Sequence, residues 1–325
     1  MKRREVMAGL GAAVAWPMAT RAQQASKVRR IGFLGAISAS GYASQVEGLR
    51  AGLRELGYVD GENMVIEFRW AEEKYDRLPE LAADLARLRV DVLVTHGTPG
   101  TVAAKRATTT IPIVAAAVGD PVATGIVTGL VQPGGNVTGV AIFSPELGAK
   151  RLQVIKEALP HLRRVAVLLN PDNALGAKIL PAIEFAARSL GVQLQPLTVR
   201  APDEFEAAFS SMANGHAEAV VVTDDGMLIA NAGTLGDIAT NQRVPAIGFT
   251  ELAQGGGLIG YGVNFPETFR QAATLVDKVL KGAKPADLPF EQATKFKTIV
   301  NLKAAKALGI DLPTSLLLRA DEVIE

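Results

Sequence analysis

The chain has 325 residues, of which 48% are hydrophobic and 21% are charged. This is the composition of a globular protein long enough for two domains, and it excludes a disordered or fibrous chain. The formal net charge of +1 gives no electrostatic basis for a nucleic-acid partner. The chain has no cysteine, which excludes disulfides, thiolate nucleophiles, cysteine-ligated metals and a lipid-bearing N-terminal cysteine.

The first 22 residues have the pattern of an export signal. Lys2-Arg3-Arg4 is a basic start, 6–20 is apolar and rich in small residues, and Thr20-Arg21-Ala22 offers small residues where a signal peptidase cleaves. The apolar run is shorter than the ~20 residues that a helix needs to span a bilayer. We therefore expect a signal peptide over 1–22, cleaved near Ala22, and an exported mature protein that is neither lipidated nor inserted in the membrane. The export route stays open.

From residue 28 onward, short β-rich runs alternate with helical patterns, which is typical of a parallel sheet covered on both faces. A helix with apolar residues from Val46 to Leu56 ends at Gly57, where a C-terminal cap belongs, and Leu78 to Leu88 marks the next helix. The first half has predicted strands over 28–35, 64–70, 90–95, 111–118 and 137–142.

The second half of the chain repeats this order. A helix ends at Gly191, which lies 134 residues after Gly57, and strands are predicted over 163–169, 192–199, 217–223, 244–247 and 258–260. A near-constant offset across four units predicts two similar doubly wound parallel-sheet lobes. Each α/β lobe is expected to have its own core.

The connections between these lobes predict a hinge. A helix opens at Ser144-Pro145, so the first crossing is expected near 141–146. A helix over 265–281 and a strand-like run over 290–301 must return to the sheets, which predicts two or three crossings in all. The predicted lobes are 28–143 with about 264–284, and 144–263 with about 285–325.

In open α/β sheets, ligands bind beyond the carboxyl ends of the strands. Thr98-Pro99 and Asp120-Pro121 each place a capping residue before a proline, which predicts two helix N-termini facing the space between the lobes. Such N-termini favour a carboxylate or another anion. Asp120 and Asp224 could meet an ammonium group, and Tyr261 offers aromatic surface with a hydroxyl. The alternative that Thr98 and Asp120 only cap helices stays open.

The sequence has no recognisable catalytic motif. Of the three histidines, His96 has no neighbour at metal-ligand spacing, and no nucleophile elbow or P-loop is present. We expect no enzyme activity, no metal and no cofactor.

Several motifs resemble one protein family. They are Gly48-Leu-Arg-Ala-Gly-Leu-Arg-Glu-Leu-Gly57-Tyr58, Tyr75-Asp-Arg-Leu-Pro-Glu-Leu81, Thr95-His-Gly-Thr-Pro99, Gly119-Asp-Pro121, Gln132-Pro-Gly-Gly-Asn-Val-Thr-Gly139 and Ser315-Leu-Leu-Leu-Arg-Ala-Asp-Glu-Val-Ile324. Over essentially the whole mature chain, the sequence resembles the ABC transporter substrate-binding family, whose TrpX-like relatives bind aromatic amino acids. The resemblance implies a type I periplasmic-binding-protein fold, with three hinge crossings and a ligand enclosed between two lobes.

The resemblance also implies ligand-binding residues and a function. The matching positions are Ser38, His96, Gly97, Thr98, Asp120, Pro121, Asn170, Asp224 and Tyr261. The implied protein is the periplasmic solute-binding component of an ABC importer. It would work as a monomer and deliver a small zwitterionic or anionic solute, an aromatic or branched amino acid among the candidates, to an inner-membrane permease. An exported ligand-sensing subunit for a membrane kinase or chemoreceptor needs the same cleft, so this alternative stays open.

Overall fold

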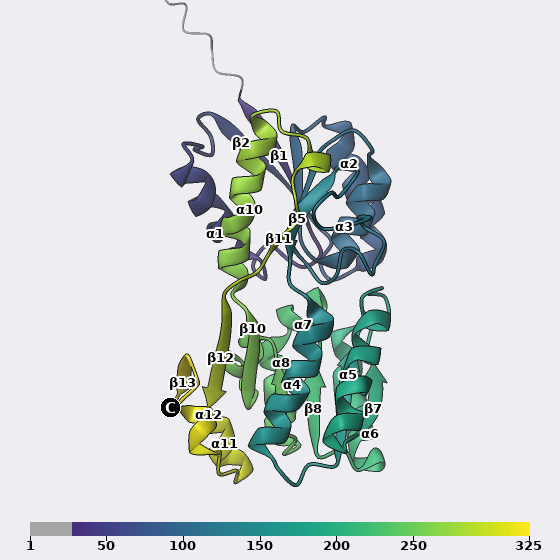
Figure 1. Cartoon of the computed structure of the whole chain (residues 1–325), viewed down its shortest axis with the longest axis vertical. Helices are drawn as coiled ribbons and strands as arrows, with labels where there is room; N and C mark the ends of the chain where they lie inside the picture. Colours follow the sequence, from purple (N-terminus) through teal and green to yellow (C-terminus); the bar gives the residue numbers. More distant parts are fainter. Residues whose placement is uncertain (1–27) are drawn as a thin grey trace, which may run out of the picture.

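The computed structural model describes residues 28–325, so the predicted signal peptide lies outside the described residues. The chain forms two lobes, each built on one largely parallel sheet (Figure 1). The predicted fold class, two similar doubly wound lobes, is confirmed. No helix among residues 28–325 is both long enough and apolar enough to cross a membrane.

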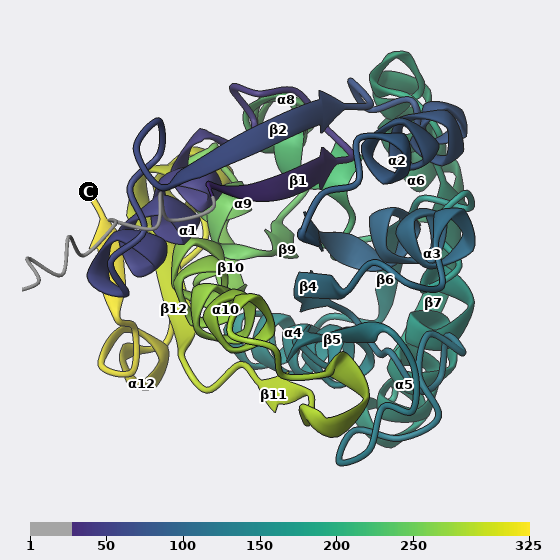
Figure 2. The same cartoon turned by 90° about the horizontal axis from the view of Figure 1, so that it is seen from above.

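The first lobe has a six-stranded parallel sheet in the order β11-β5-β4-β3-β1-β2. Its first five strands are β1 (Arg29–Gly35), β2 (Met64–Trp70), β3 (Val92–Thr95), β4 (Ile113–Val118) and β5 (Val137–Ala141). Helices α1 (Ala43–Glu55) and α10 (Phe265–Leu280) cover one face, and α2 (Leu78–Arg87) and α3 (Gly97–Ala107) cover the other (Figure 2). β2 is an edge strand, which explains its alternating polar residues.

The second lobe has a seven-stranded sheet in the order β13-β12-β10-β9-β8-β6-β7. Its strands are β6 (Arg164–Leu169), β7 (Gln193–Thr198), β8 (Ala219–Val222), β9 (Ala246–Gly248), β10 (Ile259–Val263), β12 (Phe296–Asn301) and β13 (Glu322–Ile324). The order β7-β6-β8-β9-β10 reproduces β2-β1-β3-β4-β5 in the first lobe, so the repeat predicted from the sequence is confirmed. β12 runs antiparallel to β10.

Helices cover both faces of the second sheet as well. They include α4 (Ser144–Ala158) and α5 (Gly176–Leu190) on one side, and α6 (Phe205–Gly215) and α8 (Ala232–Asn241) on the other. The central strand β8 serves both layers, because successive strand side chains point to opposite faces. Val220 packs in the same core as Phe205 and Leu235, whereas Val221 packs with Leu152 in the other core.

Short elements complete the chain. They are the helices α7 (Gly226–Ala230), α9 (Thr250–Gln254), α11 (Leu302–Leu308) and α12 (Thr314–Leu317), the 3-10 turns η1 (Tyr75–Arg77), η2 (Pro202–Glu204) and η3 (Pro285–Asp287), and the strand β11 (Glu291–Gln292).

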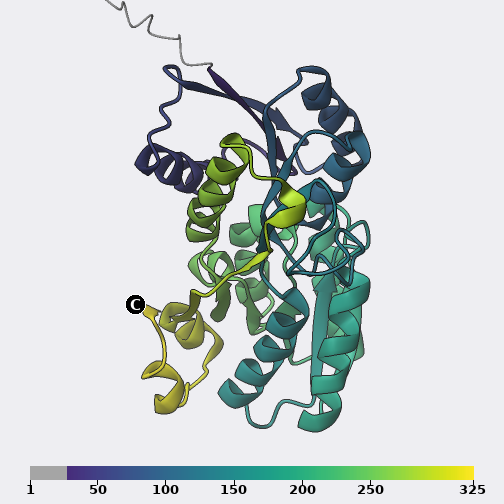
Figure 3. The same cartoon turned by 45° about the horizontal axis from the view of Figure 1, so that its top comes forward.

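Three chain segments cross between the lobes. The first joins β5 to α4 through Phe143, which has a left-handed φ of 51° that a bulky residue rarely adopts. The second joins β10 to α10, and the third runs from β11 to β12 in the yellow-green part of the chain (Figure 3). Three adjacent crossings allow the lobes to rotate against each other as a hinge.

The third crossing differs from the expected position. The sequence predicts that the second lobe resumes at about residue 285, but β11 pairs in parallel with β5, at the edge of the first sheet. Thr138 Oγ1 also donates to Leu288 O at 3.0 Å, which ties η3 to this lobe. Ala293 N also donates to Ala141 O of β5 at 3.0 Å. Residues 285–293 therefore lie with the first lobe, and the crossing occupies 294 and 295. The predicted single strand over 290–301 is in fact two strands in different sheets.

Candidate functional site

A cavity lies between the lobes at the carboxyl ends of the strands, where ligands of open α/β sheets bind. The wall from the first lobe contains 96–99, which follow β3, and Gly119, which follows β4. The wall from the second lobe contains Leu175 and 224–226, which follow β8. The two halves of the structural repeat thus contribute corresponding strand ends to one site.

Three long helices begin at this cavity. Gly97 starts α3, Ser144 starts α4 and Phe265 starts α10, and all three residues line the space. The first N–H groups of a helix have no partner within the helix, and the helix dipole makes this end attractive to negative charge. The His96 side chain makes no capping bond to α3. The cavity is therefore suited to an anionic group on the ligand.

The predicted role of Thr98 as a helix cap is wrong. Helix α3 already begins at Gly97, with His96 in extended conformation before it, so Thr98 lies inside the first turn and Pro99 is the third helical residue. Proline is tolerated there because a first-turn N–H would be unpaired in any case. The hydroxyl of Thr98 is thereby available to something other than its own helix.

Two buried hydroxyls in the cavity have no hydrogen-bond partner. Among the buried polar side-chain atoms of residues 28–325, four lack one, and Thr98 Oγ1 and Ser144 Oγ are two of the four. Thr98 is 1% exposed and Ser144 is fully buried. An unpaired buried hydroxyl costs about 1–3 kcal/mol, so this pair is unfavourable unless a ligand or water supplies the missing bonds.

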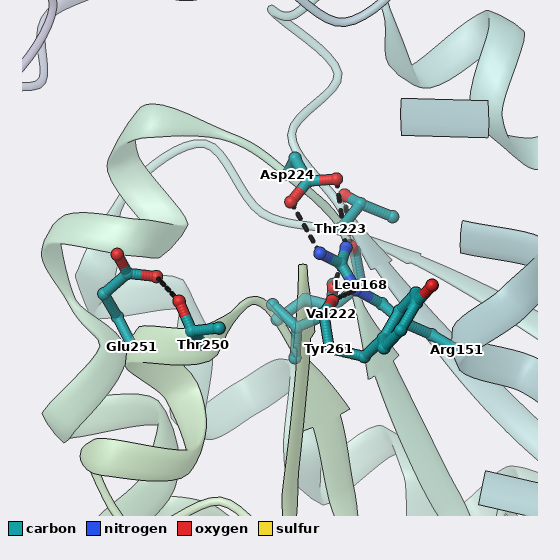
Figure 4. A network of polar contacts seen from close by, with 8 residues as sticks. All are labelled: Arg151, Leu168, Val222, Thr223, Asp224, Thr250, Glu251 and Tyr261. Atoms are coloured by element: carbon teal, nitrogen blue, oxygen red, sulfur yellow. Dashed lines mark hydrogen bonds and ion pairs between the residues drawn. The ribbon is translucent and has the colours of Figure 1, made fainter. Parts of the chain in front are cut away.

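Asp224 lines the cavity, but its charge is already balanced by a buried arginine. Arg151 on α4 is fully buried, and its Nη2 and Nη1 donate to Asp224 Oδ1 at 2.8 Å and Oδ2 at 3.0 Å. Its Nε donates to Tyr261 O at 2.8 Å, so the guanidinium lies between β8 and β10 (Figure 4). Each carboxylate oxygen of Asp224 accepts one bond, which leaves lone pairs open toward a ligand.

The neighbouring acid, Asp225, has no cationic partner among the described residues. Its side chain caps α7 by accepting from Met227 N and Leu228 N. It also accepts from Asn170 Nδ2 at 3.2 Å, from Asn173 Nδ2 at 3.0 Å and from the hydroxyl of Tyr75 at 3.0 Å. Burial raises the pKa of Asp225 above that of an ordinary aspartate. The uncompensated negative charge of the site therefore belongs to Asp225, which is not among the residues predicted from the sequence.

His96 is held as a neutral side chain. It is 7% exposed, packs edge-on against Phe265, and its Nδ1 lies 2.9 Å from the hydroxyl of Tyr42. Burial lowers the pKa of His96 from 6.5 to about 4. At neutral pH the ring contributes an aromatic edge and a hydrogen-bonding nitrogen, but no charge.

This burial predicts a pH dependence of stability. Between pH 6.5 and 4 the unfolded chain binds a proton at His96 and the folded chain does not. The free energy of unfolding is therefore highest above pH 6.5 and decreases as the pH falls through this window. The loss is about 3 kcal/mol in the free energy of unfolding, given the lowering to about 4. Urea unfolding from pH 7 to 4 measures it. His96→Gln should reduce the pH dependence, whereas replacing the exposed His161 by glutamine should not.

The nine sequence-predicted residues do not all meet in one place. Four line the cavity: His96, Gly97, Thr98 and Asp224. Asn170 lies behind it as a donor to Asp225.

The other four candidates lie outside the cavity lining. The hydroxyl of Ser38 lies 3.0 Å from that of Ser40, two residues further along the chain. Pro121 is buried and follows Asp120 directly. The predicted helix at Asp120 is wrong, because its Oδ1 accepts from Val122 N and Ala123 N within a turn. The ring of Tyr261 stacks on Phe296, 6.4 Å between centroids, beside the crossing segments.

The cavity is narrow in this arrangement of the lobes. About 30 Å³ is open to the centre of a water-sized sphere, which is room for roughly two waters at ~10–15 Å³ each. A solute the size of an amino acid can enter only when the lobes separate, and lining side chains must rearrange around it when the lobes close again. Binding at this place is therefore coupled to lobe motion.

Comparison with known proteins places the chain in a family. Residues 30–324 match the family model described as ABC transporter substrate binding protein. A tyrosine-binding protein of Clostridioides difficile is 26% identical over 265 residues, which is 81% of this chain and 76% of that protein. The resemblance noted in the sequence is thereby confirmed.

Two solved structures bear on the arrangement of the lobes. An ABC domain from Streptococcus pneumonia in complex with L-Trp is 26% identical, with a TM-score of 0.85 over 91% of this chain and 99% of that one. The ligand-free, open structure of a substrate-binding protein from Clostridium difficile is also 26% identical, but its TM-score is 0.66 over 92% and 99% of the chains. At equal identity, the lobes of this chain are arranged more like the L-Trp complex. The chain belongs to the ABC transporter substrate-binding protein family.

Proposed function

We propose that this protein is the periplasmic solute-binding component of an ABC importer, and that its ligand is a small zwitterion, an amino acid with an apolar side chain. The family membership and the relatives named for binding tyrosine and L-Trp support this proposal. The basic and apolar pattern of residues 1–22 supports export. The observation that carries the ligand class is the pairing of two unsatisfied hydroxyls with one uncompensated carboxylate in one cavity.

The carboxylate of the ligand would lie at the start of α3. The N–H groups of Gly97 and Thr98, with the unpartnered Thr98 Oγ1, can donate to it there. Ser144 Oγ at the start of α4 is the second unpartnered donor in the same cavity. Hydrogen bonds donated to an ionised acceptor are about twice as strong as those between neutral groups, which favours a carboxylate over a hydroxyl or a carbonyl.

The ammonium group would lie on the side of the second lobe. Asp224 supplies open lone pairs, and Asp225 supplies a negative charge that no cation among the described residues balances. Both acids line the cavity. A buried charge without a partner is unfavourable, so an ammonium ion is stabilised here in preference to a neutral group.

The remainder of the lining suits an apolar side chain. Ile142, Leu175, Ile229 and Phe265 are at most 8% exposed and border the cavity. Ligand pockets of this kind combine apolar walls with a few polar groups that set orientation.

Thermal-shift measurements with L-tyrosine, L-tryptophan, L-leucine and benzoate test this proposal. A ligand that binds only the folded state raises the melting temperature. We expect at least one of the three amino acids to do so, and benzoate, which lacks the ammonium group, to do so less. If no amino acid shifts the transition, or if benzoate is the strongest ligand, the proposed ligand class is wrong.

The variant Thr98→Val is expected to bind the stabilising amino acid about tenfold more weakly, because it removes one donor to a charged group. Titration calorimetry measures the affinity. Thr108→Val is a suitable control, because the hydroxyl of Thr108 bonds to the backbone N of Thr110 and Ile111 at the far end of α3. Equal affinity of Thr98→Val and the parent would remove Thr98 from the site.

A further inference from the structure

A second space between the lobes lies outside the ligand cavity. We call it the outer groove; it has a volume of about 640 Å³, and its walls are 72–76 from the first lobe and Asn170, Asp172 and 200–202 from the second. Among the described residues, Tyr75 is the one that lines both the outer groove and the ligand cavity. Tyr75 therefore lies between the two spaces.

Tyr75 is held in this place by the opposite lobe. It belongs to η1 of the first lobe, and its hydroxyl donates to Asp225 Oδ2 at 3.0 Å and accepts from Met227 N at 3.2 Å, both in the second lobe. The close fit extends to Gly226, where a β-carbon would lie 3.1 Å from the Tyr75 hydroxyl oxygen. These bonds exist only while the lobes are together.

A second bond between the lobes comes from the same loop. Asn231 Nδ2, at the start of α8, donates to Glu73 Oε2 at 2.9 Å. Glu72 and Glu73 have φ values of 52° and 64°, a left-handed conformation that is unfavourable for residues other than glycine. Two consecutive residues in this conformation persist when the surrounding structure holds them in place, and here they present Glu73 and Tyr75 to the second lobe.

We propose that Tyr75 is a gate that closes the ligand cavity toward the outer groove, and that its bonds to Asp225 and Met227 set how long the lobes stay closed. This inference rests on the proposed function only for the identity of what the gate retains. The closing itself follows from the contacts between the lobes. The Asp225 carboxylate thus has two roles: it accepts the hydrogen bond that holds Tyr75 in place, and it provides negative charge to the ligand cavity. A solute can leave only after the Tyr75–Asp225 bond breaks.

A measurement without ligand tests the gate. The chain has no cysteine, so spin labels can be attached at Glu80→Cys on α2 and Lys178→Cys on α5, both exposed and on different lobes. In the labelled protein with Tyr75→Phe, we expect the ratio of closed to open lobes to fall about tenfold relative to the labelled parent, because one hydrogen bond to a charged group is lost. The distance distribution from pulsed electron–electron double resonance gives the populations of closed and open lobes.

Tyr58→Phe is the matched control. The Tyr58 hydroxyl also donates to an aspartate, Asp277 Oδ1, at 3.0 Å, but both residues lie in the first lobe. Loss of a tyrosine–aspartate bond within one lobe should leave the distance distribution as in the parent. The inference is overturned if Tyr75→Phe leaves the distribution unchanged, or if Tyr58→Phe shifts it equally.

A measurement with ligand distinguishes failure of the proposed gate from failure of the proposed function. With whichever of L-tyrosine and L-tryptophan binds the parent, Tyr75→Phe should raise the dissociation rate about tenfold in stopped-flow measurements. If neither amino acid binds, the proposed ligand class fails, and the distance measurement still decides the gate.

Discussion

Replacing Asp224 by alanine is expected to lower the free energy of unfolding by about 3–5 kcal/mol, because it leaves the fully buried Arg151 guanidinium without its carboxylate. The two groups make a bidentate pair at 2.8 and 3.0 Å, with the carbonyl of Tyr261 as a third acceptor. Urea unfolding at neutral pH measures the loss. A binding defect in Asp224→Ala therefore does not by itself identify a ligand contact, because the same substitution destabilises the second lobe.

Two further variants make this expectation specific. Asp172→Ala removes an ion pair with Arg200 in which both side chains are more than half exposed, and this variant should change stability little. The double variant Arg151→Met/Asp224→Leu removes both charges and should recover most of the loss, since burying a charge pair is itself costly. Parental stability of Asp224→Ala would contradict the buried ion pair.

Gly119→Val is expected to weaken ligand binding by roughly 10- to 100-fold while leaving the fold intact. A β-carbon at Gly119, in the first lobe, would overlap Leu175 Cδ2 of the second lobe. Leu175 is 3% exposed and has little room to move. Overpacking of this kind costs about 1–3 kcal/mol, and separation of the lobes relieves it, so the cost falls on the closed state and thereby on affinity. Titration calorimetry and urea unfolding together measure the two effects.

Gly129→Val tests the same substitution in the same loop without the contact between lobes. The nearest heavy atom to a β-carbon at Gly129 is Gln132 O at 3.8 Å, so this variant should bind and fold like the parent. Adding Leu175→Ala to Gly119→Val should restore part of the affinity, because it frees the space that the valine needs. Unchanged affinity in Gly119→Val would show that binding does not require the lobes to close as described.

Most of the fold could be predicted from the sequence because its signals are local. Gly57 and Gly191 end corresponding helices, with φ values of 89° and 64° that favour glycine, and they reveal the repeat. The alternation in β2 indicates an edge strand, and the structure places it there. The third crossing was not predictable in this way, because the two-residue strand β11 is recognisable only by its pairing with β5.

The site was predictable in part. The rule that ligands bind at strand ends pointed to Thr98 and Asp224, which line the cavity. The same rule also pointed to Asp120 and Tyr261, which do not line it. Arg151 could not be predicted, because a lone arginine within a helix usually faces water. Only the fold shows that it lies between β8 and β10. The role of Tyr75 could not be predicted either, because its hydrogen-bond partners lie in the other lobe.

Asp224 and Asp225 have different roles that no local feature of the sequence distinguishes. The two acids are adjacent, and both follow β8. Which one is neutralised depends on Arg151, 73 residues away in sequence, and which one bridges the lobes depends on Tyr75. Contacts over such separations carry no local signal. The charge of the site could therefore be assigned only from the structure.

The most direct test is a crystal structure grown with the amino acid that gives the largest thermal shift. We expect that molecule between the lobes, with its carboxylate bonded to Thr98 Oγ1 and the start of α3, and its ammonium group beside Asp224 and Asp225. Density for the amino acid at any other place, or in the reverse orientation with its ammonium group at Thr98, would contradict the account.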